Sequence, residues 1–309
     1  MKRKPLFISA VCVLILACAC ISLAQGKRVK IAEASFDFHK NLIFLKVKIN
    51  GKGPFNVMLD TGTNPSAIDS ATARELGLKL KATGEKAAGG GTSANAVYDV
   101  EPVSVAVGKL KAKNIEISAV DLSAIGKAIG KPLHGILGHS FLNNRVVQID
   151  YPKRLVRFYS KPAGRTPSKH SSAANQTTLP FRYANESILI EDVQVNGKKV
   201  TTLFDTGLNG VFAVMPSALS ALDLEEEFNV AKPAKSVGFS GASTSRIGTV
   251  KTVKIGILSV DSAAVVFWER NTGHDTTSYG FTIGNGFLKG FIVTVDYRNS
   301  VITLEKPRA

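Results

Sequence analysis

The amino-acid sequence predicts an all-β protein made of two tandem copies of one lobe, with only short helices. Three observations predict it: apolar stretches rich in β-branched residues, tight-turn dipeptides between them, and landmarks that recur at a nearly constant spacing. The chain has 309 residues, of which 44% are hydrophobic, so it is long enough for two lobes that each bury a core.

The first strands of each copy are predicted on either side of an Asn-Gly turn. Residues 42–49 (LIFLKVKI) and 55–59 (FNVML) flank Asn50-Gly51, a dipeptide that supplies the positive φ angles of a two-residue hairpin. The second copy repeats this order from residue 188 to residue 204, with Asn196-Gly197 in the turn. Later segments also have strand patterns: EPVSVAVGKL, RVVQIDY, KTVKIGILSV and FIVTVDY.

Two short helices are predicted between the strands. One follows Asp69, whose side chain suits a helix N-cap, in the sequence DSATARELGL. The other covers residues 216–228 (PSALSALDLEEEF), which begin with a proline, a residue favoured in the first turn, and continue into an acidic run.

The two copies are related by an offset of 145 or 146 residues. Asn50 matches Asn196 (196 − 50 = 146), and Asp60 matches Asp205 (205 − 60 = 145). Further landmarks follow in the same order, Phe-Leu at 141 and 287 and the segments IDYPKRLVRF and VDYRNSVITL. We therefore predict a duplication with a signal peptide at 1–24, a first lobe at 25–160, a polar linker at 161–178 and a second lobe at 179–309.

The first 24 residues have the layout of a secretory signal. Three basic residues precede an apolar stretch that ends at a small-residue cleavage site after Ala24. The sequence LILAC, which ends at Cys18, also resembles a bacterial lipoprotein box and would give an N-terminal lipid anchor. We expect an exported protein, periplasmic or extracellular, and favour the soluble form over the lipoprotein. No later segment approaches the roughly 18 apolar residues of a membrane span.

The remaining composition excludes several classes of partner and chemistry. The net charge is +15, but no dense basic run or aromatic stripe marks a nucleic-acid surface. The five histidines have no metal-ligand spacing, so we expect no metal site. The sequence GHSFL lacks the glycine, two residues after the serine, that a nucleophile elbow requires.

Each copy carries an apolar run that leads directly into Asp-Thr-Gly. The first is FNVMLDTGT with Asp60, and the second is TTLFDTGL with Asp205. Each is followed, further along, by an apolar segment with a glycine and then Phe-Leu, in HGILGHSFL and YGFTIGNGFL. On these residues the chain resembles the pepsin and retropepsin aspartic proteases over nearly all of the mature sequence, and most closely the bacterial retropepsin-like members in duplicated form.

The resemblance implies acid-protease-like β-barrel lobes with an active-site cleft between them, where Asp60 and Asp205 face one another across a water. Two carboxylates about 4 Å apart repel by about 4 kcal/mol at an effective dielectric of about 20, so one keeps its proton. Thr63 can donate a hydrogen bond to Asp60, whereas Leu208 has no hydroxyl for Asp205, so we expect the proton on Asp205. The ionised Asp60 would then activate the water, and no cofactor is needed.

The resemblance also gives roles to residues around the aspartates. Threonine hydroxyls would bond across the interface, and glycines would let the backbone approach the carboxylates or pack behind the loops. These supporting residues are Thr61, Gly62, Thr63, Gly138, Thr206, Gly207 and Gly284. Two Gly-rich turns lie where the family places a flap over the substrate, the alternative being surface loops that contact no substrate. The flap candidates are Gly90, Gly91, Thr92, Ser240 and Gly241.

We therefore expect an exported aspartic endopeptidase that acts on polypeptides and works as a monomer, because the duplication supplies both halves of the cleft. The alternative is a catalytically silent duplicate that binds peptides or envelope polymers. Two departures from the family pattern allow it. Leu208 stands where Ser, Thr or Ala is usual, and Thr282 replaces the first apolar residue of the second glycine segment.

Overall fold

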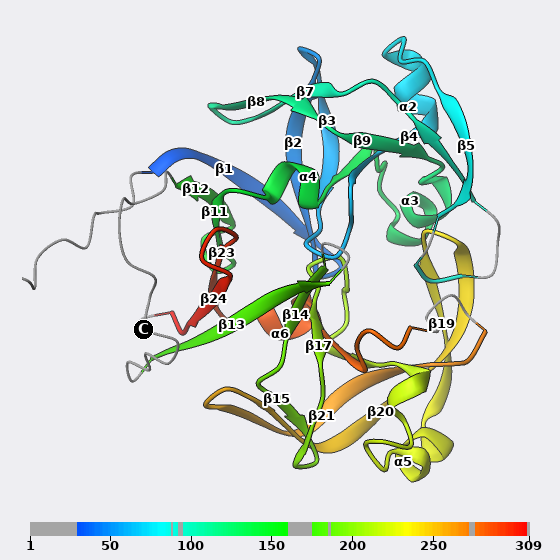
Figure 1. Ribbon diagram of the computed structural model, residues 1–309, viewed down its shortest axis with the longest axis vertical. Helices are drawn as coiled ribbons and strands as arrows, with labels where there is room; N and C mark the ends of the chain where they lie inside the picture. Colours follow the sequence, from blue (N-terminus) through cyan, green and yellow to red (C-terminus); the bar gives the residue numbers. More distant parts are fainter. Residues whose placement is uncertain are drawn as a thin grey trace, which may run out of the picture.

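The computed structural model describes residues 30–87, 89–91, 95–159, 175–184, 187–271 and 276–307. They form two lobes stacked along the long axis of the molecule and joined on one side by a shared sheet (Figure 1). The signal predicted at 1–24 lies outside the described residues, as do residues 161–174 of the predicted linker. Within the described ranges, no helix is long and apolar enough to cross a membrane.

The first lobe is a twisted sheet with three short helices. The predicted hairpin is confirmed, because β2 pairs with β3 in an antiparallel register that turns at Asn50-Gly51. The elements of this lobe are β1 (Lys30–His39), β2 (Leu42–Ile49), β3 (Lys52–Leu59), β4 (Ser66–Asp69), α2 (Ser70–Glu75), β5 (Lys81–Lys86), β6 (Ala96–Asp99), β7 (Val103–Val107), β8 (Leu110–Ile115), β9 (Ile117–Val120), α3 (Ser123–Ile129), β10 (Gly135–Leu137) and α4 (His139–Leu142).

The second lobe repeats this plan with longer strands at its far end. Its β20 and β21 form an extended hairpin, and β19 pairs with the beginning of β20. The elements of this lobe are β14 (Ser187–Ile190), β15 (Val193–Val195), β16 (Lys198–Lys199), β17 (Thr202–Phe204), β18 (Phe212–Val214), η1 (Pro216–Ala218), α5 (Glu225–Val230), β19 (Lys232–Gly238), β20 (Gly241–Ile255), β21 (Leu258–Trp268), β22 (Phe281–Ile283) and α6 (Asn285–Leu288).

A six-stranded antiparallel sheet joins the lobes. Its order is β1-β12-β11-β23-β24-β13, so β11 of the first lobe pairs directly with β23 of the second. The offset of the duplication recurs here, since β11 begins at residue 146 and β23 at residue 292 (292 − 146 = 146). The strands not yet given are β11 (Val146–Asp150), β12 (Leu155–Tyr159), β13 (Gln176–Ala184), β23 (Ile292–Asp296) and β24 (Val301–Glu305).

The start of β13 differs from the predicted lobe boundary. The predicted linker includes residues 176–178, but Gln176, Thr177 and Thr178 pair with β24 at the edge of the shared sheet. Their threonines are buried there. The sequence QTT is polar, and hydrogen bonds to a distant strand make it part of the sheet.

The core runs through both lobes and is built largely from alternating strand positions. Strand β7, for example, buries its first, third and fifth residues. The largest fully buried side chains include six phenylalanines contributed by both lobes: Phe141, Phe158, Phe204, Phe212, Phe267 and Phe281. Burial of each such side chain stabilises the fold by about 2 kcal/mol relative to exposure, so each lobe has a substantial core of its own.

One predicted helix is confirmed and the other is wrong in its extent. The Asp69 side chain accepts hydrogen bonds from Ala71 N and Thr72 N and caps α2, as predicted. The helix predicted over 216–228 is instead the short η1 and the separate α5. The helix is interrupted because Asp223 has a φ angle of +51°, which lies outside the right-handed helical region.

Candidate active site

The sheet of each lobe delivers one aspartate to the boundary between the lobes. β3 ends just before Asp60, and β10 lies beside it in parallel, with Asp60 N donating to the Leu137 carbonyl at 3.0 Å. The second lobe is equivalent, because β17 pairs in parallel with β22 and Asp205 N donates to the Ile283 carbonyl at 3.0 Å. The two apolar segments with a glycine that the sequence singles out contain β10 and β22. These strands therefore hold the start of each Asp-Thr-Gly loop.

Two threonines lock the loops together by four hydrogen bonds. Thr61 N donates to Thr206 Oγ1 and Thr206 N donates to Thr61 Oγ1, both at 3.0 Å. Each hydroxyl then donates to a backbone carbonyl of the opposite lobe, Thr61 Oγ1 to Phe204 at 2.9 Å and Thr206 Oγ1 to Leu59 at 3.1 Å. Both threonines are buried, so the lock fixes the two loops across the interface.

The glycine of each loop faces the carboxyl group of the other. A Cβ atom at Gly62 would lie 2.8 Å from Asp205 Cγ, and one at Gly207 would lie 2.5 Å from Asp60 Cγ. Any side chain at either position would therefore displace a carboxyl group. Each glycine N–H also donates to the aspartate of its own loop at 2.7 Å. The structure thus brings Asp60 and Asp205 together in one site.

The glycines behind the loops are packed just as closely. A Cβ atom at Gly138 would clash with the carbonyl of Thr63, and one at Gly284 would lie 2.5 Å from the carbonyl of Gly210. Neither position can take a side chain without moving the loop in front of it.

The surroundings of the two carboxylates are unequal. Thr63 Oγ1 donates to Asp60 Oδ2 at 2.6 Å, whereas Leu208 gives Asp205 no hydroxyl. Burial, followed by the charge of Asp60, raises the pKa of Asp205 well above its ordinary value, although the N–H groups of Gly207 and Leu208 act in the opposite direction. The pKa of Asp205 is thus raised, as the sequence analysis expects, but its causes are burial and the neighbouring carboxylate rather than the side chain at position 208.

The residues predicted as flaps bring the lobes together a second time. Ser240, at the turn between β19 and β20, donates from N to the Gly90 carbonyl at 2.9 Å and from Oγ to the Ala87 carbonyl at 2.6 Å. A Cβ atom at Gly91 would clash with Ser240, so these turns are in close contact. Gly241 continues the same turn into β20. Thr92, the fifth candidate, lies outside the described residues.

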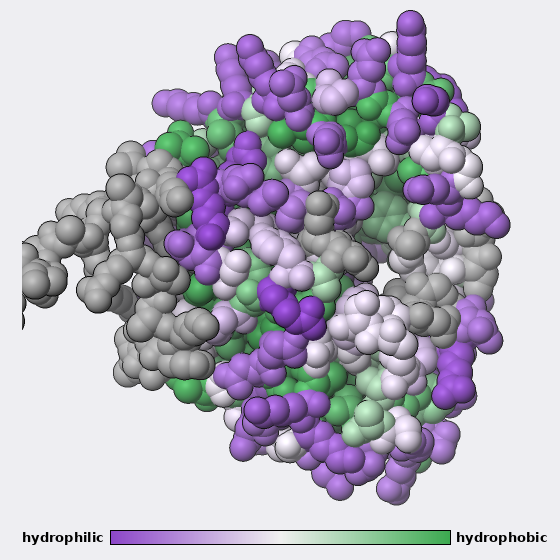
Figure 2. Space-filling model, viewed as in Figure 1, coloured by the Kyte–Doolittle hydropathy of each residue, from purple (hydrophilic) through white to green (hydrophobic). Residues whose placement is uncertain are grey.

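This second contact lies on the opposite side of the molecule from the shared sheet (Figure 1). Figure 2 shows hydrophilic residues over much of the outer surface of the two lobes. Asn95 adds a further bond between lobes, from Nδ2 to the Phe239 carbonyl at 2.9 Å. The lobes are thus joined at both ends of the boundary that holds the aspartates.

Sequence reasoning missed several residues beside the site. Tyr279 is close enough to Asp205 that burial and the aspartate charge raise the pKa of the tyrosine to about 12. Asn41 Nδ2 donates to the Asn209 carbonyl at 3.0 Å, so the β1–β2 turn braces the loop of the other lobe. An asparagine or tyrosine alone carries no sequence signal for such a contact, since each partner is more than 70 residues away.

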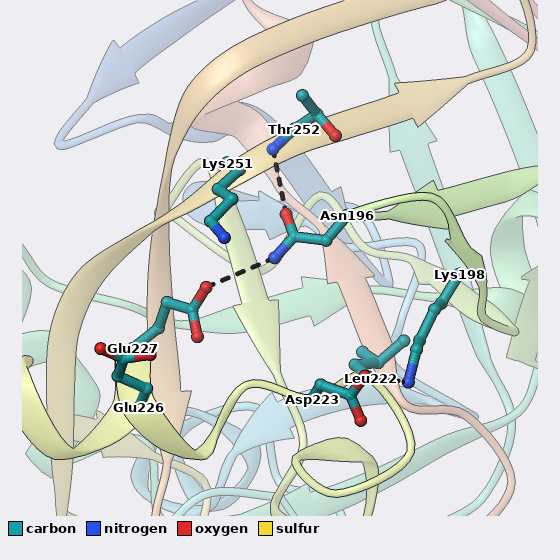
Figure 3. Close-up of a pocket in the computed structure, with 8 residues that line it drawn as sticks. All are labelled: Asn196, Lys198, Leu222, Asp223, Glu226, Glu227, Lys251 and Thr252. Carbon is teal, nitrogen blue, oxygen red and sulfur yellow. Dashed lines mark hydrogen bonds and ion pairs between the residues drawn. The ribbon is translucent and has the colours of Figure 1, made fainter.

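A hollow in the second lobe lies apart from the aspartates. Figure 3 shows Asn196 at its centre, accepting from Thr252 N at 3.1 Å and donating to Glu227 at 3.4 Å. Its other lining residues are Lys198, Leu222, Asp223, Glu226 and Lys251. These bonds connect the β15–β16 turn to β20 and α5. The polar residues of the hollow therefore hold elements of the second lobe together. Among the described residues, no group of three His, Cys, Asp or Glu side chains could hold a metal ion.

Comparison with known proteins agrees with the duplicated plan. The model of a family described as aspartyl protease matches the chain twice, over residues 45–141 and 191–283, together more than half of its length. Each match contains one Asp-Thr-Gly loop. Among solved structures, the chain is similar to a retropepsin-like aspartic protease from Rickettsia conorii, with 16% identity and a TM-score of 0.33 over 42% of this chain and 90% of that one. No curated protein matches the sequence.

Proposed function

The chain belongs to the aspartyl protease family, and from that membership we propose that it is an exported endopeptidase that hydrolyses peptide bonds with Asp60, Asp205 and an activated water. The observation that carries the proposal is the locked pair of loops, in which the glycine of each loop faces the carboxyl group of the other. One chain therefore supplies both acids.

The unequal surroundings of the two acids assign their roles. Asp60, which accepts a hydrogen bond from Thr63, is the ionised partner and takes a proton from the attacking water. Asp205, whose pKa is raised, is the protonated partner and donates to the oxygen of the peptide carbonyl as negative charge develops there. Proton exchange between the two acids then allows the amine to leave.

The turns that contain Gly90 and Ser240 are proposed to close over a polypeptide that lies along the boundary between the lobes, where Asp60 and Asp205 meet. Their contact, at the side of the molecule opposite the shared sheet, combines backbone and hydroxyl hydrogen bonds with the packing of Phe239 against an apolar cluster of the first lobe. Opening would break these few hydrogen bonds and uncover the Phe239 ring, which a bound polypeptide could then cover in place of the first lobe.

The second candidate function is a catalytically silent duplicate that binds peptides or envelope polymers. Leu208 favours it, because this residue packs on the apolar side of the Asp205 loop where a hydroxyl would assist ionisation. We favour the protease because a buried pair of carboxylates is costly to retain without catalysis.

A peptide-library assay separates the two functions. We expect the purified mature chain to cleave internal peptide bonds between acidic and neutral pH, and a transition-state-mimicking inhibitor of aspartic proteases to stop cleavage. Asp60→Asn and Asp205→Asn should each abolish cleavage while the circular dichroism spectrum stays unchanged. Asp261→Asn, the same change on an exposed strand position, is the matched control and should keep full activity. Binding of peptides without cleavage would establish the silent duplicate instead.

Export is tested separately, in the organism's own cells or a bacterial host. Mass spectrometry of the mature N-terminus should find a chain that begins at Gln25, as expected for cleavage after Ala24. A lipid-labelled chain that begins at Cys18 would show that the lipoprotein form is the correct one.

A further inference from the structure

We propose that Tyr151 and Asn285 form a buried bridge that positions the Asp205 loop, and that the equivalent bridge behind the Asp60 loop has been lost. The inference rests on the proposed function, because it concerns how unequally the two halves of that site are held. Neither residue belongs to an Asp-Thr-Gly loop.

The bridge consists of two hydrogen bonds that cross between the lobes. Tyr151 Oη donates to Asn285 Oδ1 at 2.5 Å, and Asn285 Nδ2 donates to the Thr206 carbonyl at 2.5 Å. Tyr151 directly follows β11 in the shared sheet of the first lobe, whereas Asn285 is the first residue of α6 in the second. The shared sheet is thereby connected to the loop that carries Asp205.

The bridge holds the loop at two points. Asn285 N donates to the Leu208 carbonyl at 2.8 Å, in addition to the bond from its side chain to Thr206. These two carbonyls lie on either side of Gly207, the glycine that faces Asp60. Asn285 and Thr206 are completely buried, so water cannot replace either bond without local opening.

Tyr151 is needed to orient the amide. A buried asparagine can present either its oxygen or its NH₂ group to a neighbour, and only the NH₂ group can donate to the Thr206 carbonyl. The tyrosine hydroxyl donates to the amide oxygen and therefore directs the NH₂ group toward Thr206. Without that hydroxyl, the amide oxygen is buried without a donor, and the bond to the loop loses its fixed direction.

The first half of the site has the same framework but a different residue in the key position. The offset of the duplication places His139 opposite Asn285 (285 − 139 = 146) and Tyr297 opposite Tyr151 (297 − 151 = 146). His139 N donates to the Thr63 carbonyl at 2.8 Å, as Asn285 N does to Leu208. The backbone of the two halves is therefore equivalent.

The side chains of the two halves are not equivalent. The His139 and Tyr297 rings meet edge to face, with centroids 6.3 Å apart. The Tyr297 hydroxyl is buried and has no hydrogen-bond partner among the described residues. Tyr297 thus packs against His139, whereas Tyr151 makes a directed hydrogen bond to Asn285, which in turn holds the Asp205 loop.

Tyr151→Phe and Tyr297→Phe form a matched pair that tests the difference. Both remove one buried hydroxyl at equivalent positions, but only the first breaks a bridge. We expect Tyr151→Phe to lower kcat about tenfold with KM nearly unchanged, because one buried bond is lost behind the loop and substrate contacts remain. Tyr297→Phe should leave both constants within about twofold of the parent chain.

Amide hydrogen exchange tests the bridge without any need for activity. In Tyr151→Phe, protection of Gly207 should fall about tenfold, while that of Gly62, whose N–H donates within its own loop, stays the same. Equal effects of the two tyrosine variants on exchange would overturn the proposal. If the parent chain cleaves no peptide, the proposed function fails and exchange alone decides whether the bridge exists.

A second test places an asparagine at position 139, and it can be carried out even if Tyr151→Phe does not fold. His139→Asn gives Tyr297 the partner that its counterpart has. In that background, Tyr297→Phe should lower protection of the Asp60 loop about tenfold, although it has no such effect in the parent chain. If Tyr297→Phe leaves amide protection unchanged both in the parent chain and in His139→Asn, then His139 is not the reason that the bridge is missing.

Discussion

Leu208 and Thr63 occupy equivalent positions, each three residues after an aspartate, and their difference makes the surroundings of the two carboxyl groups unequal. The Thr63 hydroxyl donates to Asp60 Oδ2 at 2.6 Å. Leu208 instead packs in a small apolar cluster with buried Met215 and Trp268. The two side chains therefore add to the inequality between the acids, beside the burial that raises the pKa of Asp205.

We expect Leu208→Thr to move the alkaline limb of the pH profile for kcat toward acid. A hydroxyl beside Asp205 stabilises its charged form, so the proton that catalysis needs is lost at a lower pH. The shift should be about one pKa unit, since one hydrogen bond of about 1.4 kcal/mol is added. Leu208→Val, which has the shape of threonine without the hydroxyl, is the control. Superimposable profiles of the Thr and Val variants would show that residue 208 does not face the pair.

The raised pKa of Asp205 also predicts how stability depends on pH. Because the folded-state pKa lies above the ordinary value of about 3.9, the folded chain holds a proton that the unfolded chain releases. The free energy of unfolding should therefore decrease as the pH rises from about 4 through the raised pKa. Asp205→Asn cannot ionise, so its advantage in stability over the parent should grow with pH in urea titrations. A difference that is constant with pH would contradict the shift.

At the scale of elements, two strand ends and the threonines that follow them connect the lobes at their centre. β3 ends at Leu59 and β17 at Phe204, and the carbonyls of these two residues accept the hydroxyls of the opposite threonines. Each threonine hydroxyl is both donor and acceptor. Its loss therefore leaves two buried backbone groups without a partner.

Thr206→Val should lower the free energy of unfolding by about 3 kcal/mol, because Thr61 N and the Leu59 carbonyl each lose a partner at about 1–3 kcal/mol. Thr206→Ser keeps the hydroxyl and should retain most of the stability. Chemical unfolding of both variants measures the difference. If the valine and serine variants are equally stable, the lock does not contribute through its hydroxyl.

At the scale of the whole molecule, the duplication places both halves of the site in one covalent chain. The shared sheet joins the lobes through β11 and β23, and the turns at Gly90 and Ser240 join them on the opposite side. A second copy of the chain is therefore not needed to assemble the site.

We predict that the protein acts as a monomer. Activity per molecule should stay constant on dilution from about 10 μM to about 10 nM, a range over which a typical weak dimer dissociates. Sedimentation at the higher concentration should give the mass of one chain. Activity per molecule that falls in step with dissociation of a dimer would contradict the prediction.

The sequence by itself determined the fold class, the duplication and the two aspartates. These depend on local patterns: strand alternation, the Asn-Gly turn before β3, the cap at Asp69, and motifs repeated at a fixed offset. Such patterns can be recognised in a sequence because the backbone geometry of a short segment depends mainly on the residues of that segment. Even so, the segment 216–228 was predicted as one helix and is interrupted at Asp223, where the φ angle is positive.

Only the tertiary structure decided how the two halves support one another. The bridge from Tyr151 to Asn285, the contact of Ser240 with Gly90 and the bond from Asn41 to Asn209 each join residues more than 130 positions apart. Ordinary polar residues make all of these contacts, and their partners are chosen by the packing of the lobes rather than by sequence neighbours. The duplication gives the two halves the same backbone. The side chains that meet across the boundary between the lobes make the two halves unequal.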